Sequence, residues 1–288
     1  MNPYLKRAAS IVVARLPLRL RRELLHFRYF HKPIPRNPVT FLGKIQWRIL
    51  HDRRSMIAIG GDKLAMKDHA ARTSPDVVVP ETIWHGQNID DILDVDWGPE
   101  WVLKPREGSG YVAFGSGSLR DSGITIEEVS AWKHMDQFRV QGEWAYGQSA
   151  PGYFLERKIP TQDGGSPNDV RFFVFDGIVR LVQTDTPRFD GVRRRFYTPD
   201  WTPLDVTQGQ AKLAPVAPRP ERLDAMLEIA AAIGAGYDFI RVDLYDVPEG
   251  IFFGEITPYP TGGMGRYSDD KFDEWLGSFW SLPVDTTD

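Results

Sequence analysis

The segment FIRVDLYDVPEGIFFGEITPYPTGG, residues 239–263, limits the possible folds of this chain more than any other stretch. Apolar and polar residues alternate over residues 239–245 and 251–256, which predicts two short β-strands. The turn formers PEG lie between the two runs, so the strands are expected to pair in antiparallel fashion. An antiparallel sheet near the C-terminus is therefore the first expectation.

Polar side chains interrupt this apolar strand pair. Successive side chains of a strand point to opposite faces, so Arg241, Asp243 and Tyr245 share one face, and Glu255 and Thr257 share a face of the partner strand. Carboxylates on an apolar sheet are costly unless they are paired or metal-bound. Two interpretations stay open: salt bridges from Arg241 to both carboxylates, or a hard-cation site with oxygen ligands.

Composition excludes several other chemistries. The 288 residues contain no cysteine, which rules out disulfides, thiolate metal sites and thiol catalysis and fits a cytoplasmic setting. With 42% hydrophobic residues the chain should be globular, as one large or two to three small units. The net charge of −4 gives no argument for nucleic-acid binding.

The N-terminal residues 1–36 are strongly basic and contain a single acid, Glu23. Their apolar run, residues 8–14, is too short to span a bilayer and has no signal-peptide cleavage pattern. Two short amphipathic helices, broken near Pro17, are expected. Their expected buried residues are Leu18, Leu24, Leu25 and Phe27. The segment is either a helical cap with a solvated basic face or a contact with an anionic membrane surface or polymer.

The rest of the chain mixes helices with hairpins, which favours an α+β fold over a doubly wound parallel sheet. Helices are expected after Thr40 and over residues 62–71, 127–135 and 221–233. Strands are expected over residues 77–80, 101–104, 153–159, 170–175 and 178–184. An Asp-Gly pair at residues 176–177 predicts a tight hairpin turn. Residues 90–96 are expected to be an acidic junction, and residues 188–195 a basic loop.

Two lysines are placed where they could meet phosphate. Lys63 lies in the first turn of a predicted helix, and Lys104 ends an apolar strand just before the glycine-rich run REGSG, residues 106–110. Glycines let backbone N–H groups approach phosphate oxygens, and lysine adds a compact positive charge. Taken alone, each lysine is more simply interpreted as an ordinary exposed residue.

Two carboxylates stand at the ends of neighbouring predicted strands. Glu156 and Asp169 could frame a hinge for adenine and ribose, or could be surface charge. In chain order, the two lysines, this hinge and then Asp243 with Glu255 provide every component needed to hold a nucleoside triphosphate with its metals.

This order, together with particular motifs, resembles the TupA-like ATP-grasp family over about residues 37–278. The motifs are NPVTFLGKIQW, DKLAMKDHAA, WVLKPREGSG, FLERKI, NDVRFFVFDG, FYTPDW, PRPERLDAMLEIA, FIRVDLY and FFGEITPYPTGG. The resemblance implies an ATP-grasp fold with a central lid subdomain and a C-terminal antiparallel core sheet, preceded by short helices. The implied divisions are 1–36, 37–96, 97–165 for the lid, and 166–288 for the core.

The resemblance also implies residue roles for ATP and Mg²⁺. Lys63, Lys104 and Arg241 would be catalytic, the lysines on the phosphates and the arginine on the transferred group. The other implied nucleotide residues are Arg106, Gly108, Ser109, Gly110, Glu156, Arg157, Ile159 and Asp169. Asp243 and Glu255 would bind Mg²⁺ together with Thr257, which stands where many relatives have Asn.

The implied activity is ADP-forming ligation of an amine to a carboxylate through an acyl phosphate. The acid would be a uronic acid or glutamyl group of an acidic surface polymer or its precursor, and the amine an amino acid. Expected substrate contacts are Arg188, Arg193, Arg194, Gly262 and Gly263. The alternatives are a non-catalytic nucleotide-binding accessory protein and an ATP-grasp kinase. We expect a cytoplasmic protein that binds no nucleic acid; contact of residues 1–36 with the inner membrane face or an anionic polymer is one of the two alternatives for that segment.

Overall fold

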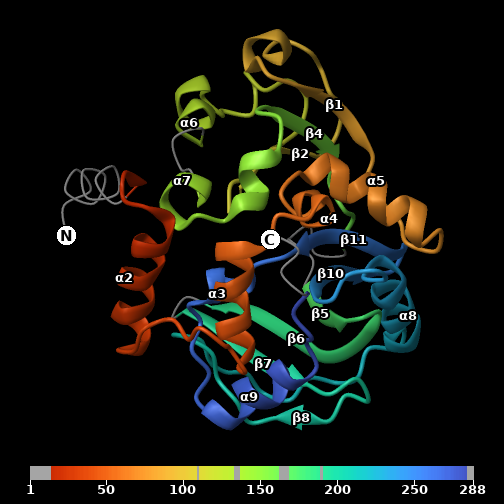
Figure 1. The fold of residues 1–288 in the computed structure, drawn as a ribbon. Helices are drawn as coiled ribbons and strands as arrows, with labels where there is room; N and C mark the ends of the chain where they lie inside the picture. The colour runs from red at the N-terminus through yellow and green to blue at the C-terminus, as the bar shows by residue number, and fades with distance from the viewer. Residues whose placement is uncertain (1–13, 109, 133–136, 162–168, 189–190, 284–288) are drawn as a thin grey trace.

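The computed structural model describes residues 14–108, 110–132, 137–161, 169–188 and 191–283, and its strands form two separate sheets (Figure 1). The larger sheet has seven strands in the order β11-β10-β5-β6-β7-β8, with β9 paired to β7. Its strands are β5 (Asp169–Phe175), β6 (Ile178–Arg188), β7 (Gly191–Tyr197), β8 (Pro203–Leu204), β9 (Lys212–Leu213), β10 (Ile240–Val247) and β11 (Gly250–Thr257). All neighbours in it are antiparallel except β7 and β9.

The smaller sheet has four antiparallel strands in the order β1-β4-β2-β3. They are β1 (Thr82–Gly86), β2 (Trp101–Pro105), β3 (Ala113–Gly115) and β4 (Tyr153–Arg157). Gly115 pairs with Trp101 of β2, and a glycine is required there because a Cβ would lie 2.3 Å from the buried Trp101 ring. Strand β1 belongs to this sheet although it precedes residue 97, the predicted start of the lid. The division of the chain into subdomains stays a prediction.

Helices cover the two sheets (Figure 1). They are α2 (Leu18–Phe30), α3 (Phe41–His51), α4 (Ser55–Ile59), α5 (Lys63–Thr73), α6 (Ile126–Ala131), α7 (Gln137–Gln141), α8 (Leu223–Ile233) and α9 (Asp270–Ser278), with the 3-10 turns η1 (Ile89–Ile92), η3 (Trp144–Gln148) and η4 (Pro260–Gly263). As predicted, Thr40 caps α3, its hydroxyl accepting a 3.1 Å bond from Gly43 N. This mixture of helices with antiparallel sheets confirms the α+β class.

An aromatic cluster anchors α3 to the larger sheet. The centroids of the Phe41 ring on α3 and the Phe239 ring lie 4.8 Å apart, and those of Phe239 and Trp280 lie 4.9 Å apart.

The predicted Asp176-Gly177 turn closes the β5–β6 hairpin of the larger sheet, with positive φ angles of 48° and 75°. Both angles suit a primed turn, whose twist matches that of the strands.

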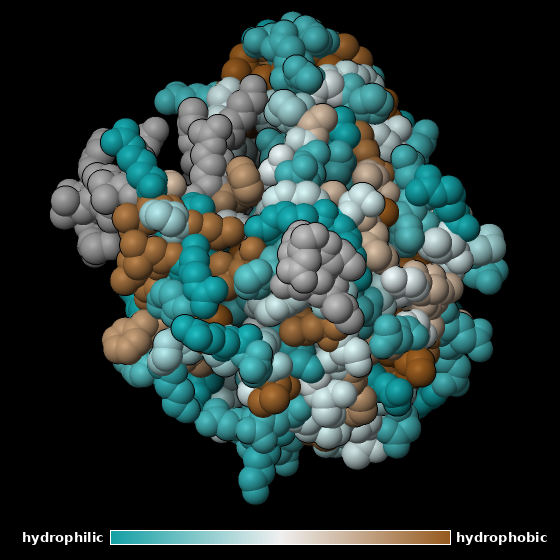
Figure 2. All heavy atoms as spheres, viewed as in Figure 1, coloured by the Kyte–Doolittle hydropathy of each residue, from teal (hydrophilic) through white to brown (hydrophobic). Residues whose placement is uncertain are grey.

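The prediction of buried residues in the N-terminal helix is only partly confirmed. Leu18 and Leu25 are half-buried, but Leu24 and Phe27 are 53% and 57% exposed, whereas Arg22 and His26 are buried. Arg22 can be buried because its guanidinium donates hydrogen bonds to the Gln46 side chain and to the Gly262 carbonyl. Apolar side chains accordingly gather on the surface over α2 (Figure 2). The predicted helix before Pro17 lies mostly outside the described residues.

Two local predictions also fail. Residues 77–80 form only an isolated bridge, Val78 with Phe252, because Pro80 cannot continue a ladder. Residues 191–195 of the expected basic loop belong to strand β7, whose run of three arginines hides the apolar alternation that marks a strand. None of the described helices is both long enough and apolar enough to cross a membrane.

Candidate active site

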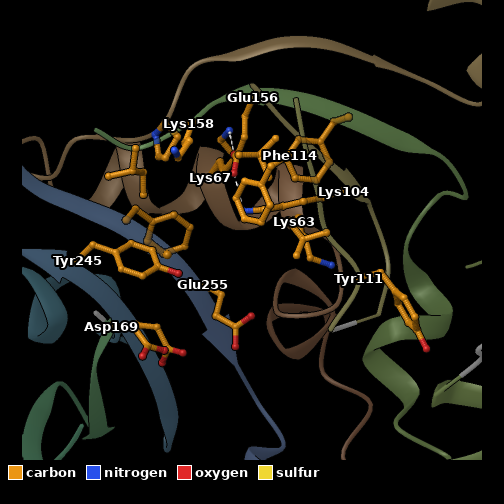
Figure 3. Close-up of a pocket in the computed structure, with 18 of the residues that line it drawn as sticks. Lys63, Lys67, Lys104, Tyr111, Phe114, Glu156, Lys158, Asp169, Tyr245 and Glu255 are labelled. Atoms are coloured by element: carbon orange, nitrogen blue, oxygen red, sulfur yellow. Dashed lines mark hydrogen bonds and ion pairs between the residues drawn. The ribbon is translucent and has the colours of Figure 1, made fainter. Parts of the chain in front are cut away.

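A cavity of about 370 Å³ lies between the two sheets and α5 (Figure 3). The smaller sheet and α5 supply its lysines together with Glu156, and the larger sheet supplies Asp169, Asp243 and Glu255. Its polar lining comprises Lys63, Lys67, Lys104, Tyr111, Glu156, Lys158, Asp169, Arg171, Asp243, Tyr245 and Glu255. Apolar groups from both sheets complete it, among them Val112, Phe114, Phe154 and Phe253.

Lys63 is fixed at the start of α5 by the loop that follows β2. Its ammonium donates to the Gly108 carbonyl, and its backbone N donates to Arg106 O at 3.1 Å. Asp62 caps α5 and also accepts from Arg106 Nη2 at 2.6 Å. Burial lowers the pKa of Lys63 to about 8, although the Glu255 charge opposes the shift. The helix start and the glycine-rich loop therefore form one unit.

Glu156 binds two lysines at once. Lys104 Nζ lies 2.5 Å from Oε1 and Lys67 Nζ 2.7 Å from Oε2. Burial alone would raise the pKa of Glu156, but the two ammonium groups lower it. Lys67 was not among the predicted site residues, although its four-residue spacing from Lys63 places both on one side of α5. Glu156, Lys67 and Lys104 form a triad that lines the cavity and places two ammonium groups there.

Asp243 and Glu255 lie directly opposite each other on β10 and β11, so the polar faces that the pattern predicted on the two strands coincide. Arg241 donates to both oxygens of Asp243 at 2.7 and 2.6 Å and to Glu255 Oε1 at 2.8 Å. Thr257 Oγ1 donates to the same Glu255 oxygen at 2.6 Å. The salt bridges that the sequence left open are thus present.

The pKa values of Asp243 and Glu255 are shifted in opposite directions. Burial raises the pKa of Asp243 to about 7, assisted by Glu255 and opposed by Arg241. In Glu255 the effect of burial is outweighed, chiefly by Arg241, and its pKa is lowered. Two close carboxylates facing a cavity fit a hard divalent cation, which takes oxygen ligands from protein, substrate phosphates and water. Within the described ranges no three acidic, His or Cys side chains converge as a complete metal site.

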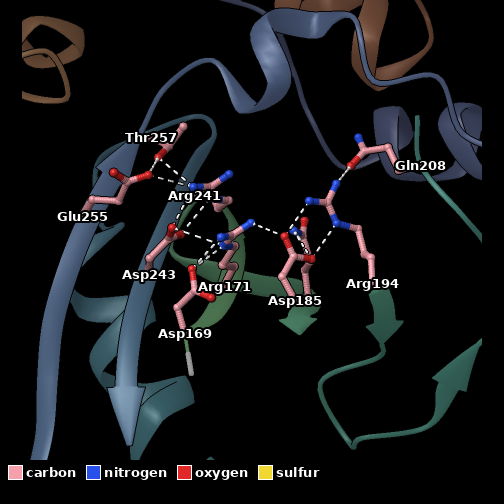
Figure 4. A network of polar contacts seen from close by, with 10 residues as sticks. Asp169, Arg171, Asp185, Arg194, Gln208, Arg241, Asp243, Glu255 and Thr257 are labelled. Atoms are coloured by element: carbon pink, nitrogen blue, oxygen red, sulfur yellow. Dashed lines mark hydrogen bonds and ion pairs between the residues drawn. The ribbon is translucent and has the colours of Figure 1, made fainter. Parts of the chain in front are cut away.

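A second network extends from Asp243 along the larger sheet (Figure 4). Arg171 donates to Asp169 Oδ2 and Asp185 Oδ2, both at 2.6 Å, and its Nε lies 3.5 Å from Asp243 Oδ2. Arg194 donates to both oxygens of Asp185 at 2.7 and 2.6 Å. Arg171 was not predicted as a site residue. A charged residue within the apolar run of β5 was the sequence feature that could have indicated it.

The predicted residues fall into several groups. Those lining the cavity are Lys63, Lys104, Gly110, Glu156, Ile159, Asp169, Asp243 and Glu255. Arg241 and Thr257 lie directly behind the carboxylates. Arg157 instead donates to Trp97 O at 2.6 Å, because successive residues of β4 face opposite sides.

The predicted substrate residues lie elsewhere. Gly262 and Gly263 form η4, Arg193 lies on β7, and Arg194 bonds to Asp185. Ser109 and the side chain of Arg188 are outside the described residues.

The chain is thus an α+β protein in which lysines and carboxylates face one another across a cavity between two sheets. Comparison with known sequences gives its family. The chain belongs to the TupA-like ATP-grasp family, whose pattern (TupA-like ATPgrasp) matches residues 43–280. This match confirms the predicted ATP-grasp fold. No curated protein matches the chain.

Solved structures of similar fold are ATP-grasp ligases. The VanG D-Ala:D-Ser ligase from Enterococcus faecalis is 16% identical with a TM-score of 0.40, covering 69% of this chain and 52% of that chain. An L-amino acid ligase from Bacillus licheniformis is 14% identical with a TM-score of 0.39, covering 71% and 42%. The ATP-grasp ligase PsnB, complexed with its minimal precursor, is 12% identical with a TM-score of 0.35, covering 71% and 53%. The chain spans about half the length of these proteins.

Proposed function

We propose that this protein is an ADP-forming, ATP-dependent carboxylate–amine ligase. The observation that carries the proposal is the cavity that sets Lys63, Lys67 and Lys104 against Asp243 and Glu255. Phosphoryl transfer depends on positioning and charge neutralisation more than on a protein nucleophile, and this set of side chains suits it.

The lysines are assigned to the nucleotide phosphates. Lys63 and Lys104 line the cavity from α5 and β2, and the loop of residues 106–110 is assigned to covering the phosphates, where its backbone N–H groups would donate to them. Residues 156–159 are assigned to adenine, with Phe154 and Phe253 as apolar walls of the same cavity. Asp169 is assigned to the ribose.

Asp243 and Glu255 are the residues that would hold Mg²⁺, with Thr257 beside them. The ion, when bound, would neutralise phosphate charge. Arg241 already links these three side chains and is assigned to orienting them and to steadying the transferred phosphoryl group.

The reaction has two steps. A carboxylate oxygen of the acid attacks the γ-phosphorus, the bond from phosphorus to the β,γ-bridging oxygen breaks, and ADP leaves. The amine nitrogen then attacks the acyl carbon, inorganic phosphate departs, and the nitrogen loses a proton to give the amide. Closure of the smaller sheet over the cavity would keep water from the acyl phosphate.

The proposed acid is a uronic acid or glutamyl carboxylate of an acidic surface polymer or its precursor, and the proposed amine is an amino acid. Family membership supports this choice. We place the reaction in the cytoplasm, at the inner membrane face.

The test is a screen of the purified protein with ATP, Mg²⁺ and pooled uronic acids, glutamyl peptides and amino acids. Mass spectrometry should find a product equal to acid plus amine minus water, and ADP should form only when both are present. A phosphorylated product from a hydroxyl acceptor alone would instead identify a kinase. No ATP turnover with any pool would favour the accessory-protein alternative.

A further inference from the structure

Helix α2 is attached to the protein by its polar face. Arg22 is fully buried and donates to Gln46 Oε1 from Nε at 3.0 Å and from Nη2 at 2.6 Å. Its Nη2 also donates to Gly262 O at 2.6 Å. The buried His26 has its Nδ1 2.8 Å from Lys32 O, in the segment that follows the helix. The contacts of Arg22 fix which side of the helix faces the protein.

The opposite side of α2 presents an apolar stripe to solvent. Leu20, Leu24 and Phe27 follow one another at spacings of four and three residues, so they share one helix face. They are 46%, 53% and 57% exposed. Apolar side chains gathered at this position are visible in Figure 2. A surface helix normally turns its apolar stripe inward, so this face calls for an external partner.

Exposed basic residues accompany the stripe. Arg19 and Arg28 lie on α2, and Lys32 and Arg36 lie in the segment that follows it. The single acid of this segment, Glu23, accepts a bond from Ile34 N at 3.0 Å and lies 3.9 Å from Arg19. The whole chain carries a net charge of −4, so the positive charge is a local property of this surface. An apolar stripe accompanied by exposed basic residues matches the two layers of an anionic bilayer surface.

We propose that α2 binds the surface of an anionic phospholipid bilayer. Leu20, Leu24 and Phe27 enter the boundary between headgroups and acyl chains, while Arg28 and Lys32 contact lipid phosphates. The helix lies in the plane of the membrane, and its buried Arg22 keeps the protein attached to it. The inference stands independently of the ligase chemistry, since it uses none of the cavity residues.

The test is co-sedimentation of the full chain with vesicles of phosphatidylcholine alone and of phosphatidylcholine mixed with phosphatidylglycerol. Only the anionic vesicles should bind the protein. The double substitution L24Q/F27Q should weaken binding at least about tenfold, because the buried apolar area is lost. R28Q and K32Q should each weaken it about fivefold. A matched control, I178Q/V216Q, removes two equally exposed apolar residues elsewhere and should bind as the wild type does.

A second readout locates the contact. Because the chain has no cysteine, F27C and V216C each create a single labelling site for an environment-sensitive fluorophore. Anionic vesicles should shift the emission of the first to the blue and leave the second unchanged. Equal binding by L24Q/F27Q would overturn the proposal, as would equal binding to both vesicle types. A dimer in solution that L24Q/F27Q abolishes, without vesicle binding, would instead assign the face to a second copy of the chain.

Discussion

Arg241 and Asp243 are joined by two hydrogen bonds, Nε to Oδ1 at 2.7 Å and Nη2 to Oδ2 at 2.6 Å. The same guanidinium also donates to Glu255 and Thr257, so Arg241 contacts all three residues that we assign to Mg²⁺ binding. The arginine therefore holds the carboxylates in position before ATP and Mg²⁺ arrive. The salt bridge and the metal site, which the sequence presented as alternatives, are compatible parts of one arrangement.

Replacing Asp243 by Asn should reduce turnover at least about a hundredfold, because a charged oxygen ligand is lost while the side chain keeps its shape. Glu255→Gln should act in the same way. The control is Asp176→Asn in the exposed β5–β6 turn, which should leave turnover unchanged. Steady-state ADP release measures all three, with circular dichroism to confirm folding. Full activity in Asp243→Asn would contradict the assignment.

ATP affinity should fall as the pH rises past about 8, where the buried Lys63 loses its proton. The lysine contributes only while charged, and its pKa is lowered, so the loss comes earlier than for an exposed lysine. Isothermal titration across this range measures it. Lys63→Arg should remove the alkaline loss, because a guanidinium stays charged. An affinity that is constant across this range in the wild type would show that Lys63 does not meet the phosphates.

Glu156→Gln should destabilise the protein by about 3–5 kcal/mol, because Lys67 would remain buried without its counter-charge. The pKa of Glu156 lies below its ordinary value of 4.5, so its stabilisation is present above that pH and is lost as the pH falls. Urea unfolding measures the change in free energy. The matched control is Asp94→Asn, which breaks the exposed pair with Arg120 and should have no measurable effect. Equal effects of the two variants would refute the buried triad.

Gly262→Ala should destabilise the protein more than Gly209→Ala. Both glycines have φ near 60°, so each alanine incurs about 1–2 kcal/mol of left-handed backbone strain. Only at Gly262 would the new Cβ also meet side chains, 2.7 Å from Glu143 Oε1 and 2.9 Å from Gln141 Oε1, whereas nothing lies within 4 Å at Gly209. Thermal unfolding distinguishes them. Identical midpoints would mean that the turn around Gly262 relaxes freely.

Four strands of the large sheet, β5, β6, β10 and β11, could be predicted because their patterns are local. Alternation around Asp243 and Glu255, and the Asp-Gly turn at residues 176–177, specify hairpins without distant information. Strand β7 was not predicted because its run of three arginines hides the apolar alternation of a strand; the strand tolerates them because they find acidic or polar partners, such as Asp205 for Arg195 at 2.8 Å. Strand β1 escaped because its half-buried residues have no clear alternation.

Within the site, residue types were predictable and partners were not. Glu156 was expected to serve the nucleotide, yet its two oxygens bind Lys67 and Lys104, which lie 89 and 52 residues away. The inverted face of α2 was equally hidden, because it depends on Gln46 and Gly262 meeting Arg22. Such long-range polar contacts leave no periodic trace in a single sequence.

The central claim is that a carboxylate is activated by phosphorylation, and the fate of its oxygen tests this most directly. With an acid substrate labelled with heavy oxygen in its carboxylate, supplied with the amine, ATP and Mg²⁺, the released phosphate is analysed by mass spectrometry. An acyl phosphate predicts one labelled oxygen in each phosphate, with ADP as the nucleotide product. Unlabelled phosphate, or AMP with pyrophosphate, would contradict the account.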